Sequence, residues 1–263
     1  MLLVSILTTS CNRRRTDEQT LPQKNNTEKQ DTVFTVKKGS NGLEQFEDFI
    51  FEFSSAKNTQ RQRVRFPLPV IADTDTTWID KEQWNFVAVL ADTDFYTLFF
   101  NDMQQMNMER NNELDTMFVN LYFLHPRKVK ECKFERIAGE WFLTQESWRN
   151  FSGRSILDKF LDFYREFAAD KIFQQIHISS PLRYITTDPD DDFNTIEGTL
   201  SAGQWESFKP QMPTEIVSNI SYGQTFTNPR SMIMVKAGIS NGLMDILEFK
   251  RTGSKWFLVS YEN

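Results

Sequence analysis

Residues 43–68 read LEQFEDFIFEFSSAKNTQRQRVRFPL, and residues 157–182 read LDKFLDFYREFAADKIFQQIHISSPL. The two stretches align without a gap at a constant shift of 114 residues, which takes Leu43 to Leu157. Identical residues recur throughout, and in the first stretch they are Leu43, Phe46, Asp48, Phe49, Glu52, Phe53, Lys57, Gln60, Pro67 and Leu68. Chance does not readily produce such a match, so the sequence contains an internal repeat.

The far ends of the two units match as well. Residues 134–143 read FERIAGEWFL and align with FKRTGSKWFL at residues 249–258, at a shift of 115. Between these blocks, Gln83-Trp84 matches Gln204-Trp205 at a shift of 121, which indicates a small insertion around residues 187–198. A unit of about 110 residues is far longer than a solenoid repeat of roughly 20–50 residues. The sequence therefore predicts a tandem duplication of one domain, at residues 42–150 and 153–263.

Each unit is predicted to open with an amphipathic helix. Leu43, Phe46, Phe49, Ile50 and Phe53 recur at helical spacing, so they share one face. In the first unit a strand is expected at residues 63–66, a short helix at 81–86, and further strands at 95–100, 117–124, 129–137 and 140–145. Consecutive short strands favour an antiparallel sheet. The predicted fold class is α+β, with helices packed on one face of a curved antiparallel sheet in each unit.

Trp141 and Trp256 close the two units at equivalent positions, each followed by Phe-Leu. In an extended strand the Trp and the Leu two places on point to the same side. We therefore expect both tryptophans to anchor the core beneath the opening helix.

The N-terminus resembles a bacterial lipoprotein signal. An apolar run at residues 1–7 is followed by Thr8, Thr9, Ser10 and Cys11, and in such signals the cysteine becomes the lipidated N-terminus. The run is too short to span a bilayer, which takes about 20 residues. We expect an export signal at residues 1–11, a flexible linker at 12–41, and a location in the cell envelope facing the periplasm or cell surface. The membrane is then contacted through the lipid only.

Composition narrows the function classes. The formal net charge is −6 and no basic stripe is present, which argues against a nucleic-acid partner. Cys132 aligns with Leu247 in an alternating strand, so it is interpreted as a buried, unreactive thiol. No specific catalytic or metal-binding motif occurs, and we expect no cofactor and no metal.

Several residues remain as candidates for a site. Aromatic residues that include Trp78, Trp84, Tyr96 and Tyr122 are candidates for lining an open end of the first unit and binding an apolar or sugar ring, although core packing is the more ordinary use. His177 aligns with Arg63, which indicates a position that accepts basic residues, and His125 precedes Pro126 at a turn. The acidic run at 188–194 departs from a calcium loop at Phe193 and Thr199, so a solvated loop is favoured.

The order of elements, a long amphipathic helix and then an antiparallel meander ending in Trp-Phe-Leu, resembles the nuclear transport factor 2-like (NTF2-like) superfamily of cone-shaped domains. The whole chain also resembles a family of uncharacterised lipoproteins from Bacteroidetes. Such folds host enzymes, ligand binders and structural proteins, so the fold alone does not choose a function. We expect a non-catalytic protein that binds a small molecule or a cell-envelope protein. The alternative is an enzyme of dehydratase, isomerase or hydrolase type, with an Asp or His inside one cone.

Overall fold

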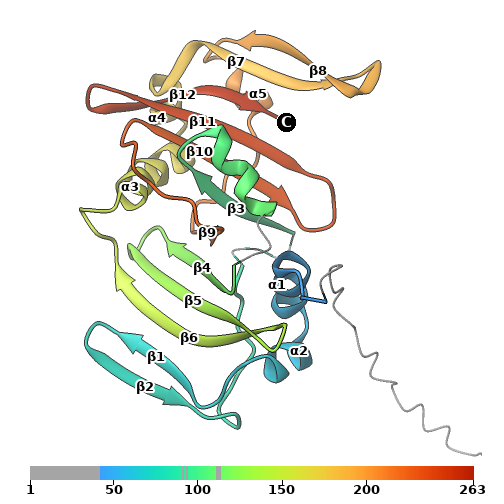
Figure 1. Ribbon diagram of the computed structural model, residues 1–263. Coiled ribbons are helices and arrows are strands. Elements are labelled where there is room, and N and C mark those ends of the chain that lie inside the picture. The colour runs from blue at the N-terminus through green and yellow to red at the C-terminus, as the bar shows by residue number, and fades with distance from the viewer. Residues whose placement is uncertain (1–41, 91, 93, 111–113) are drawn as a thin grey trace, which may run out of the picture. The chain divides into compact units, whose positions relative to one another are not determined.

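The computed structural model describes residues 42–90, 92, 94–110 and 114–263 (Figure 1). The expected export signal and linker, including Cys11, lie outside the described residues. Among those that are described, no helix is both long enough and apolar enough to span a bilayer. We refer to residues 42–150 as the N-terminal half and to residues 153–263 as the C-terminal half.

The two halves have the same order of two opening helices and then six strands, and they differ in where a further short helix stands. The N-terminal half comprises α1 (Phe46–Ser55), α2 (Lys57–Gln62), β1 (Leu68–Ala72), β2 (Asp75–Ile79), β3 (Phe95–Phe100), the 3₁₀ helix η1 (Met103–Arg110), β4 (Thr116–Phe123), β5 (Lys128–Ile137) and β6 (Glu140–Asn150). The C-terminal half comprises α3 (Ile156–Ala169), α4 (Lys171–Ile176), β7 (Ile178–Asp188), β8 (Asp191–Leu200), α5 (Trp205–Phe208), β9 (Ile216–Ser221), β10 (Ser231–Gly238), β11 (Met244–Thr252) and β12 (Lys255–Glu262). Both halves have a cis X-Pro bond at equivalent positions, Phe66-Pro67 and Ser180-Pro181.

The strands form two six-stranded sheets, and each sheet takes one strand from the other half. One sheet has the order β2-β1-β6-β5-β4-β9, and the other has the order β3-β10-β11-β12-β7-β8. β3 of the N-terminal half pairs antiparallel with β10, and β9 of the C-terminal half pairs antiparallel with β4. Figure 1 shows β3, in green, beside the red and orange strands of the C-terminal half. The exchange is reciprocal, so the contiguous boundaries expected from the repeat do not describe the sheets.

The two exchanged strands meet at Thr97 and Ser218, which stand third in β3 and third in β9. The Thr97 N–H donates to Ser218 Oγ at 2.9 Å, and the Ser218 N–H donates to Thr97 Oγ1 at 2.8 Å. The two hydroxyls donate in turn to the opposite carbonyls, at 2.7 Å from Thr97 and 3.1 Å from Ser218. Both residues are fully buried. The crossing is therefore a buried polar contact in which every backbone group named here has a partner.

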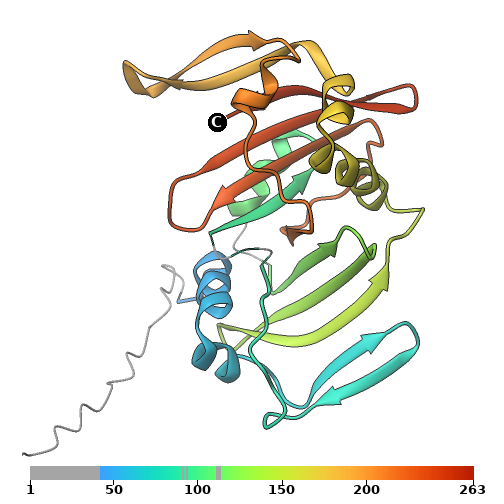
Figure 2. The same cartoon turned by 180° about the vertical axis from the view of Figure 1, so that it is seen from behind.

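In each half the helix packs on the sheet through aromatic side chains. In the N-terminal half, Phe46 of α1 contacts Trp141 edge-to-face at 5.0 Å between ring centroids. Its counterpart Phe160 of α3 contacts Trp256 at 5.2 Å in the same geometry. Figure 2 shows α3 and α4 lying over one face of the C-terminal sheet. Trp141, Leu143, Trp256 and Leu258 are all buried, which confirms the expectation that both tryptophans are core anchors.

The α+β fold class predicted from the sequence is confirmed. The strand expected at residues 95–100 has these bounds in the structure, and those expected at 117–124 and 129–137 differ by one residue at one or both ends. Two local predictions are wrong. Residues 81–86 form no helix, because Asp80 and Gln83 close only a single turn. The strand expected at 63–66 is one isolated bridge at Val64, because α2 runs to Gln62 and the paired strand starts only after Pro67.

Candidate functional site

The four aromatic residues predicted to bind a ligand do not come together. Trp78 lies on β2 and is 60% exposed. Trp84 and Tyr96 are buried in the core of the N-terminal half, where their rings contact Phe66 and Phe51. Tyr122 belongs to the other core, and burial there raises the pKa of its hydroxyl. Three of the four are thus packing residues: Trp84 in the connection between β2 and β3, Tyr96 on β3 and Tyr122 on β4.

The space between helix and sheet is filled in both halves. Phe49 and Phe53 of α1 lie against Phe134 at 5.7 and 5.3 Å between ring centroids. Phe160 and Phe167 of α3 lie against Phe249 at 5.1 and 5.3 Å. All of these rings are fully buried. The interior that would hold a ligand in an open cone is therefore occupied by the protein's own side chains.

The buried carboxylates have cationic partners. Glu44 is held by Arg63 at 2.8 Å, Asp158 by Arg149 at 2.6 Å and Glu146 by Lys130 at 2.7 Å. Asp245 accepts from the Tyr261 hydroxyl at 2.8 Å and lies 3.6 Å from Lys236, and burial together with this hydrogen bond raises the pKa of Tyr261. Paired carboxylates of this kind hold structure together rather than supplying a free general base.

The remaining reactive candidates have ordinary roles. Burial raises the pKa of the Cys132 thiol to about 12, so it stays protonated near neutrality. His125 is half exposed and lies 3.3 Å from Glu215. In the acidic run, Asp188 and Asp191 accept backbone N–H groups of the β7–β8 turn. Within the described part of the chain, no three His, Cys, Asp or Glu side chains lie close enough together to hold a metal ion.

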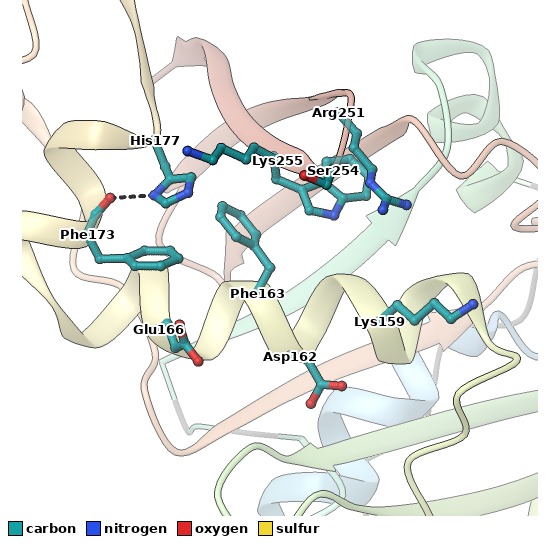
Figure 3. Close-up of a pocket in the computed structure, with 10 residues that line it drawn as sticks. Lys159, Asp162, Phe163, Glu166, Phe173, His177, Arg251, Ser254 and Lys255 are labelled. Atoms are coloured by element: carbon teal, nitrogen blue, oxygen red, sulfur yellow. Dashed lines mark hydrogen bonds between the residues drawn. The ribbon is translucent and has the colours of Figure 1, made fainter.

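One groove in the C-terminal half has the mixed lining of a binding site. It has a volume of about 410 Å³ and lies between α3, α4 and the β11–β12 hairpin (Figure 3). We call it the C-terminal groove, and its lining residues are Lys159, Asp162, Phe163, Glu166, Phe173, His177, Arg251, Ser254, Lys255 and Trp256. Figure 3 shows Phe163 projecting from α3 and Lys255 extended toward His177.

The His177 imidazole is held in a fixed orientation at the edge of this groove. Its Nδ1 lies 2.9 Å from the Phe173 carbonyl oxygen, and its ring stacks on the Phe173 ring at 4.0 Å between centroids. The ring also contacts Phe163 edge-to-face at 5.5 Å. Because Nδ1 faces a carbonyl, it carries the proton, and Nε2 is left for a ligand or solvent.

The cations that line the groove are less engaged in ion pairs than its carboxylates. Asp162 forms an ion pair with Arg127 at 2.7 Å, and Glu166 lies 3.6 Å from Arg165. Neither of these arginines lines the groove. In contrast, the side chains of Lys159, Arg251 and Lys255 make no ion pair with any residue that the structure describes. Arg251 Nε is buried and has no hydrogen-bond acceptor among those residues.

The residues predicted from the sequence to form a site do not include those of this groove, although the sequence contains one indication of it. The alignment of His177 with Arg63 marked a position that carries a basic residue in both halves. What the alignment did not reveal is that Trp256, Lys255 and Arg251, about 75 residues further along the chain, come to lie beside His177. The parallel pairing of β7 with β12 brings these distant segments together.

The fold and this groove define an NTF2-like α+β protein with a polar and aromatic site outside its filled cores. The crystal structure of an NTF2-like protein (BF2862) from Bacteroides fragilis NCTC 9343 is similar to this chain at 39% identity and a TM-score of 0.78, and the match covers 83% of this chain and 95% of that chain. The family described as a domain of unknown function (DUF4348) matches residues 25–263, and the chain belongs to this family. No curated protein matches the sequence.

Proposed function

We propose that the protein is a non-catalytic binding protein of the cell envelope and that the C-terminal groove is its binding site. The observation that carries this proposal is the contrast between filled cores and an open groove. Aromatic rings occupy the space between helix and sheet in both halves, whereas the groove beside His177 and Trp256 leaves about 410 Å³ open. A concave site with aromatic walls and a few polar groups is typical of ligand recognition.

The paired state of the buried carboxylates supports binding over catalysis. A carboxyl group that acts as a general acid or base must reach the substrate and not be committed to a partner. Glu44, Asp158, Glu146 and Asp245 all have partners inside the fold, as described above.

The proposal places the protein on the membrane through a lipid on Cys11, with the folded part carried by the segment that follows. The apolar run and small residues before Cys11 support this processing. Mass spectrometry of the mature N-terminus after expression of the full-length chain in a bacterial host is the test. A diacylglyceryl group on Cys11 is expected, and an unmodified Met1 would exclude the anchor.

The internal repeat, in which residues 43–68 align with residues 157–182, leads us to propose that the two halves arose by tandem duplication.

Binding at the groove is tested by NMR on the isotopically labelled full-length chain. The indole N–H signals of Trp256 and Trp141 report on the two equivalent regions, and single Trp→Phe variants assign them. The chain is titrated separately with a mixture of acidic tetrapeptides, a mixture of soluble oligosaccharides and a mixture of aromatic amino acids. At least one mixture is expected to shift the Trp256 signal and leave the Trp141 signal in place. If all three leave Trp256 unmoved, the groove is not a binding site.

A further inference from the structure

The N-terminal half contains the same groove with an occupant in it. Arg63 stands where the C-terminal half has His177, and the Leu143 N–H donates to the Arg63 carbonyl at 2.8 Å, just as the Leu258 N–H donates to the His177 carbonyl at 2.8 Å. Both side chains also lie beside equivalent phenylalanines: Arg63 is 5.4 Å from the centroid of Phe142, and the His177 ring is 6.0 Å from that of Phe257. The two backbones therefore present the same site.

The occupant of the N-terminal groove is the carboxylate of Glu44. Both of its oxygens accept from the Arg63 guanidinium, at 2.8 and 3.1 Å. One oxygen also accepts from the Trp141 backbone N–H at 2.7 Å, and the Glu44 carbonyl accepts from Trp141 Nε1 at 3.1 Å. The Glu44 N–H donates to the Gly139 carbonyl at 3.0 Å. An extended segment with a glutamate thus fills the groove through side chain and backbone together.

The C-terminal half does not fill its own groove, because its helix starts earlier. Phe46 and Phe160 are equivalent, yet α1 begins at Phe46 whereas α3 begins at Ile156, about one turn earlier. The extra turn is capped by the Ser155 hydroxyl, which accepts from the Asp158 N–H at 3.1 Å. Asp158, which aligns with Glu44, is therefore helical and binds Arg149 and the Ser152 N–H instead. Within the C-terminal half, residues 153–263, no segment takes the place that Glu44 has in the N-terminal half.

The groups that bind Glu44 have counterparts in the C-terminal groove. Trp256 faces Arg251 in the strand register just as Trp141 faces Arg136, so its backbone N–H is placed like that of Trp141. Trp256 is 7% exposed against 1% for Trp141, and no hydrogen bond from its Nε1 is found within the described part of the chain. Lys255 replaces Glu140, which turns an acidic position into a cationic one.

We propose that the C-terminal groove binds an extended peptide segment of a partner polypeptide through a glutamate side chain. The carboxylate lies between Lys255, the Trp256 N–H and Nε2 of His177, which takes up a proton from solvent when the carboxylate binds and then donates to it. The peptide carbonyl accepts from Trp256 Nε1, as the Glu44 carbonyl does from Trp141 in the N-terminal groove. This inference rests on the proposed binding role of the groove and names its ligand class. The unpaired cations Lys159 and Arg251 at the rim attract the same acidic segment.

The test uses a tetrapeptide that copies residues 42–45, acetyl-Gly-Leu-Glu-Gln-amide, with acetyl-Gly-Leu-Gln-Gln-amide as its uncharged match. Each is titrated into the full-length labelled chain while the Trp256 and Trp141 indole signals are followed. The glutamate peptide is expected to shift the Trp256 signal and to bind at least about tenfold more tightly than the glutamine peptide, since charge-assisted hydrogen bonds are about twice as strong as neutral ones. Equal affinity would overturn the carboxylate assignment and leave the proposed binding role intact.

Two variants locate the interaction. Lys255→Glu restores the acidic residue of the N-terminal half at an exposed hairpin position, and it is expected to weaken peptide binding about tenfold by like-charge repulsion. Lys81→Glu, an equal change of charge at an exposed residue outside the groove, is the control and is expected to leave binding unchanged. His177→Arg copies Arg63 and is expected to strengthen binding at least about threefold, because a guanidinium binds a carboxylate bidentately. If neither peptide shifts Trp256 while an oligosaccharide does, this inference fails and the proposed function stands.

Discussion

The two halves of the chain build the same groove and use it differently. In the N-terminal half, Glu44 fills it and ties the start of the fold to Arg63 and Trp141. In the C-terminal half, one additional helical turn carries the equivalent Asp158 away, and the groove stays open beside His177. The groove is thus filled by the protein's own glutamate in one half and open in the other. The difference arises from where a helix begins: the Ser155 hydroxyl caps α3, whereas Gln45 at the start of α1 makes no side-chain cap hydrogen bond.

The largest expected effect is on the free energy of unfolding, when either of the two tryptophans beside the grooves is replaced. Trp141→Ala and Trp256→Ala each remove a large buried ring and are expected to lower the free energy of unfolding by about 3–5 kcal/mol. Trp141→Ala should cost more, because Trp141 also donates from Nε1 to the Glu44 carbonyl. Urea unfolding followed by circular dichroism measures both values. Trp78→Ala, at an exposed site, is the control and is expected to change stability by less than about 0.5 kcal/mol.

The unfolding curves of Trp141→Ala and Trp256→Ala also show whether the two halves unfold independently. Because each sheet includes a strand of the other half, both variants are expected to unfold in one cooperative transition. Two separated transitions, one of them at the wild-type midpoint, would contradict an energetic coupling through the exchanged strands.

Glu44→Ala is the direct way to make the two grooves alike. It removes the carboxylate from Arg63, which is only 17% exposed, and is expected to lower the free energy of unfolding by about 1.5–3 kcal/mol. It should also open the N-terminal groove, so that isothermal titration with acetyl-Gly-Leu-Glu-Gln-amide finds two sites where the unaltered chain has one. Glu197→Ala, which breaks the exposed pair with Arg183, is the matched control and should leave the unfolding midpoint unchanged. A single site in Glu44→Ala would show that the occupied groove is not a template for the open one.

A smaller effect is expected at the crossing of β3 and β9. Thr97→Val removes a hydroxyl that donates to the Ser218 carbonyl and accepts from the Ser218 N–H. Leaving these buried groups without partners costs roughly 1–3 kcal/mol, and Ser218→Ala should cost a similar amount. A double-mutant cycle measured by urea unfolding is expected to give a coupling energy of about 0.5 kcal/mol or more. Additive effects would mean that the two residues do not stabilise the crossing together.

The smallest effect concerns Cys132, whose equivalent in the C-terminal half is Leu247. Burial raises the pKa of the thiol to about 12, so in a Cys11→Ser variant, which keeps Cys132 as its one cysteine, the native protein should resist a maleimide at pH 8 over hours and react at once in urea. The unfolded thiol ionises near pH 8.5, so the stability contributed by the buried neutral thiol is full below that pH and is lost as the pH rises toward 12. Cys132→Leu should abolish this loss above pH 8.5 and change stability at pH 7 by less than about 1.5 kcal/mol. Rapid labelling of the native chain would show that the strand opens.

Much of the fold could be predicted from the sequence because its signals are local. The phenylalanine spacing of residues 46–53 predicts a helix with one buried face, and Phe46, Phe49, Ile50 and Phe53 are buried on α1. Alternation in residues 141–143 correctly turns Trp141 and Leu143 inward. The aromatic candidates show the limit of local signals. The residue type marks Trp84, Tyr96 and Tyr122 as large rings that can be buried, but does not show whether they line a cavity or fill a packed core.

The repeat in the sequence determined the α+β elements, their order in each half and the residues at the two cores, because helix and strand periodicity depend on neighbours along the chain. Which sheet receives β3 was decided by the tertiary structure. β4 and β10 are equivalent strands of the two halves, so the repeat alone does not say which of them β3 pairs with. In the structure β3 pairs with β10 and β9 with β4, and Thr97 and Ser218 join the two exchanged strands. The open groove was decided in the same way, since it depends on side chains from α3, α4 and β12 that meet only after the sheet has formed.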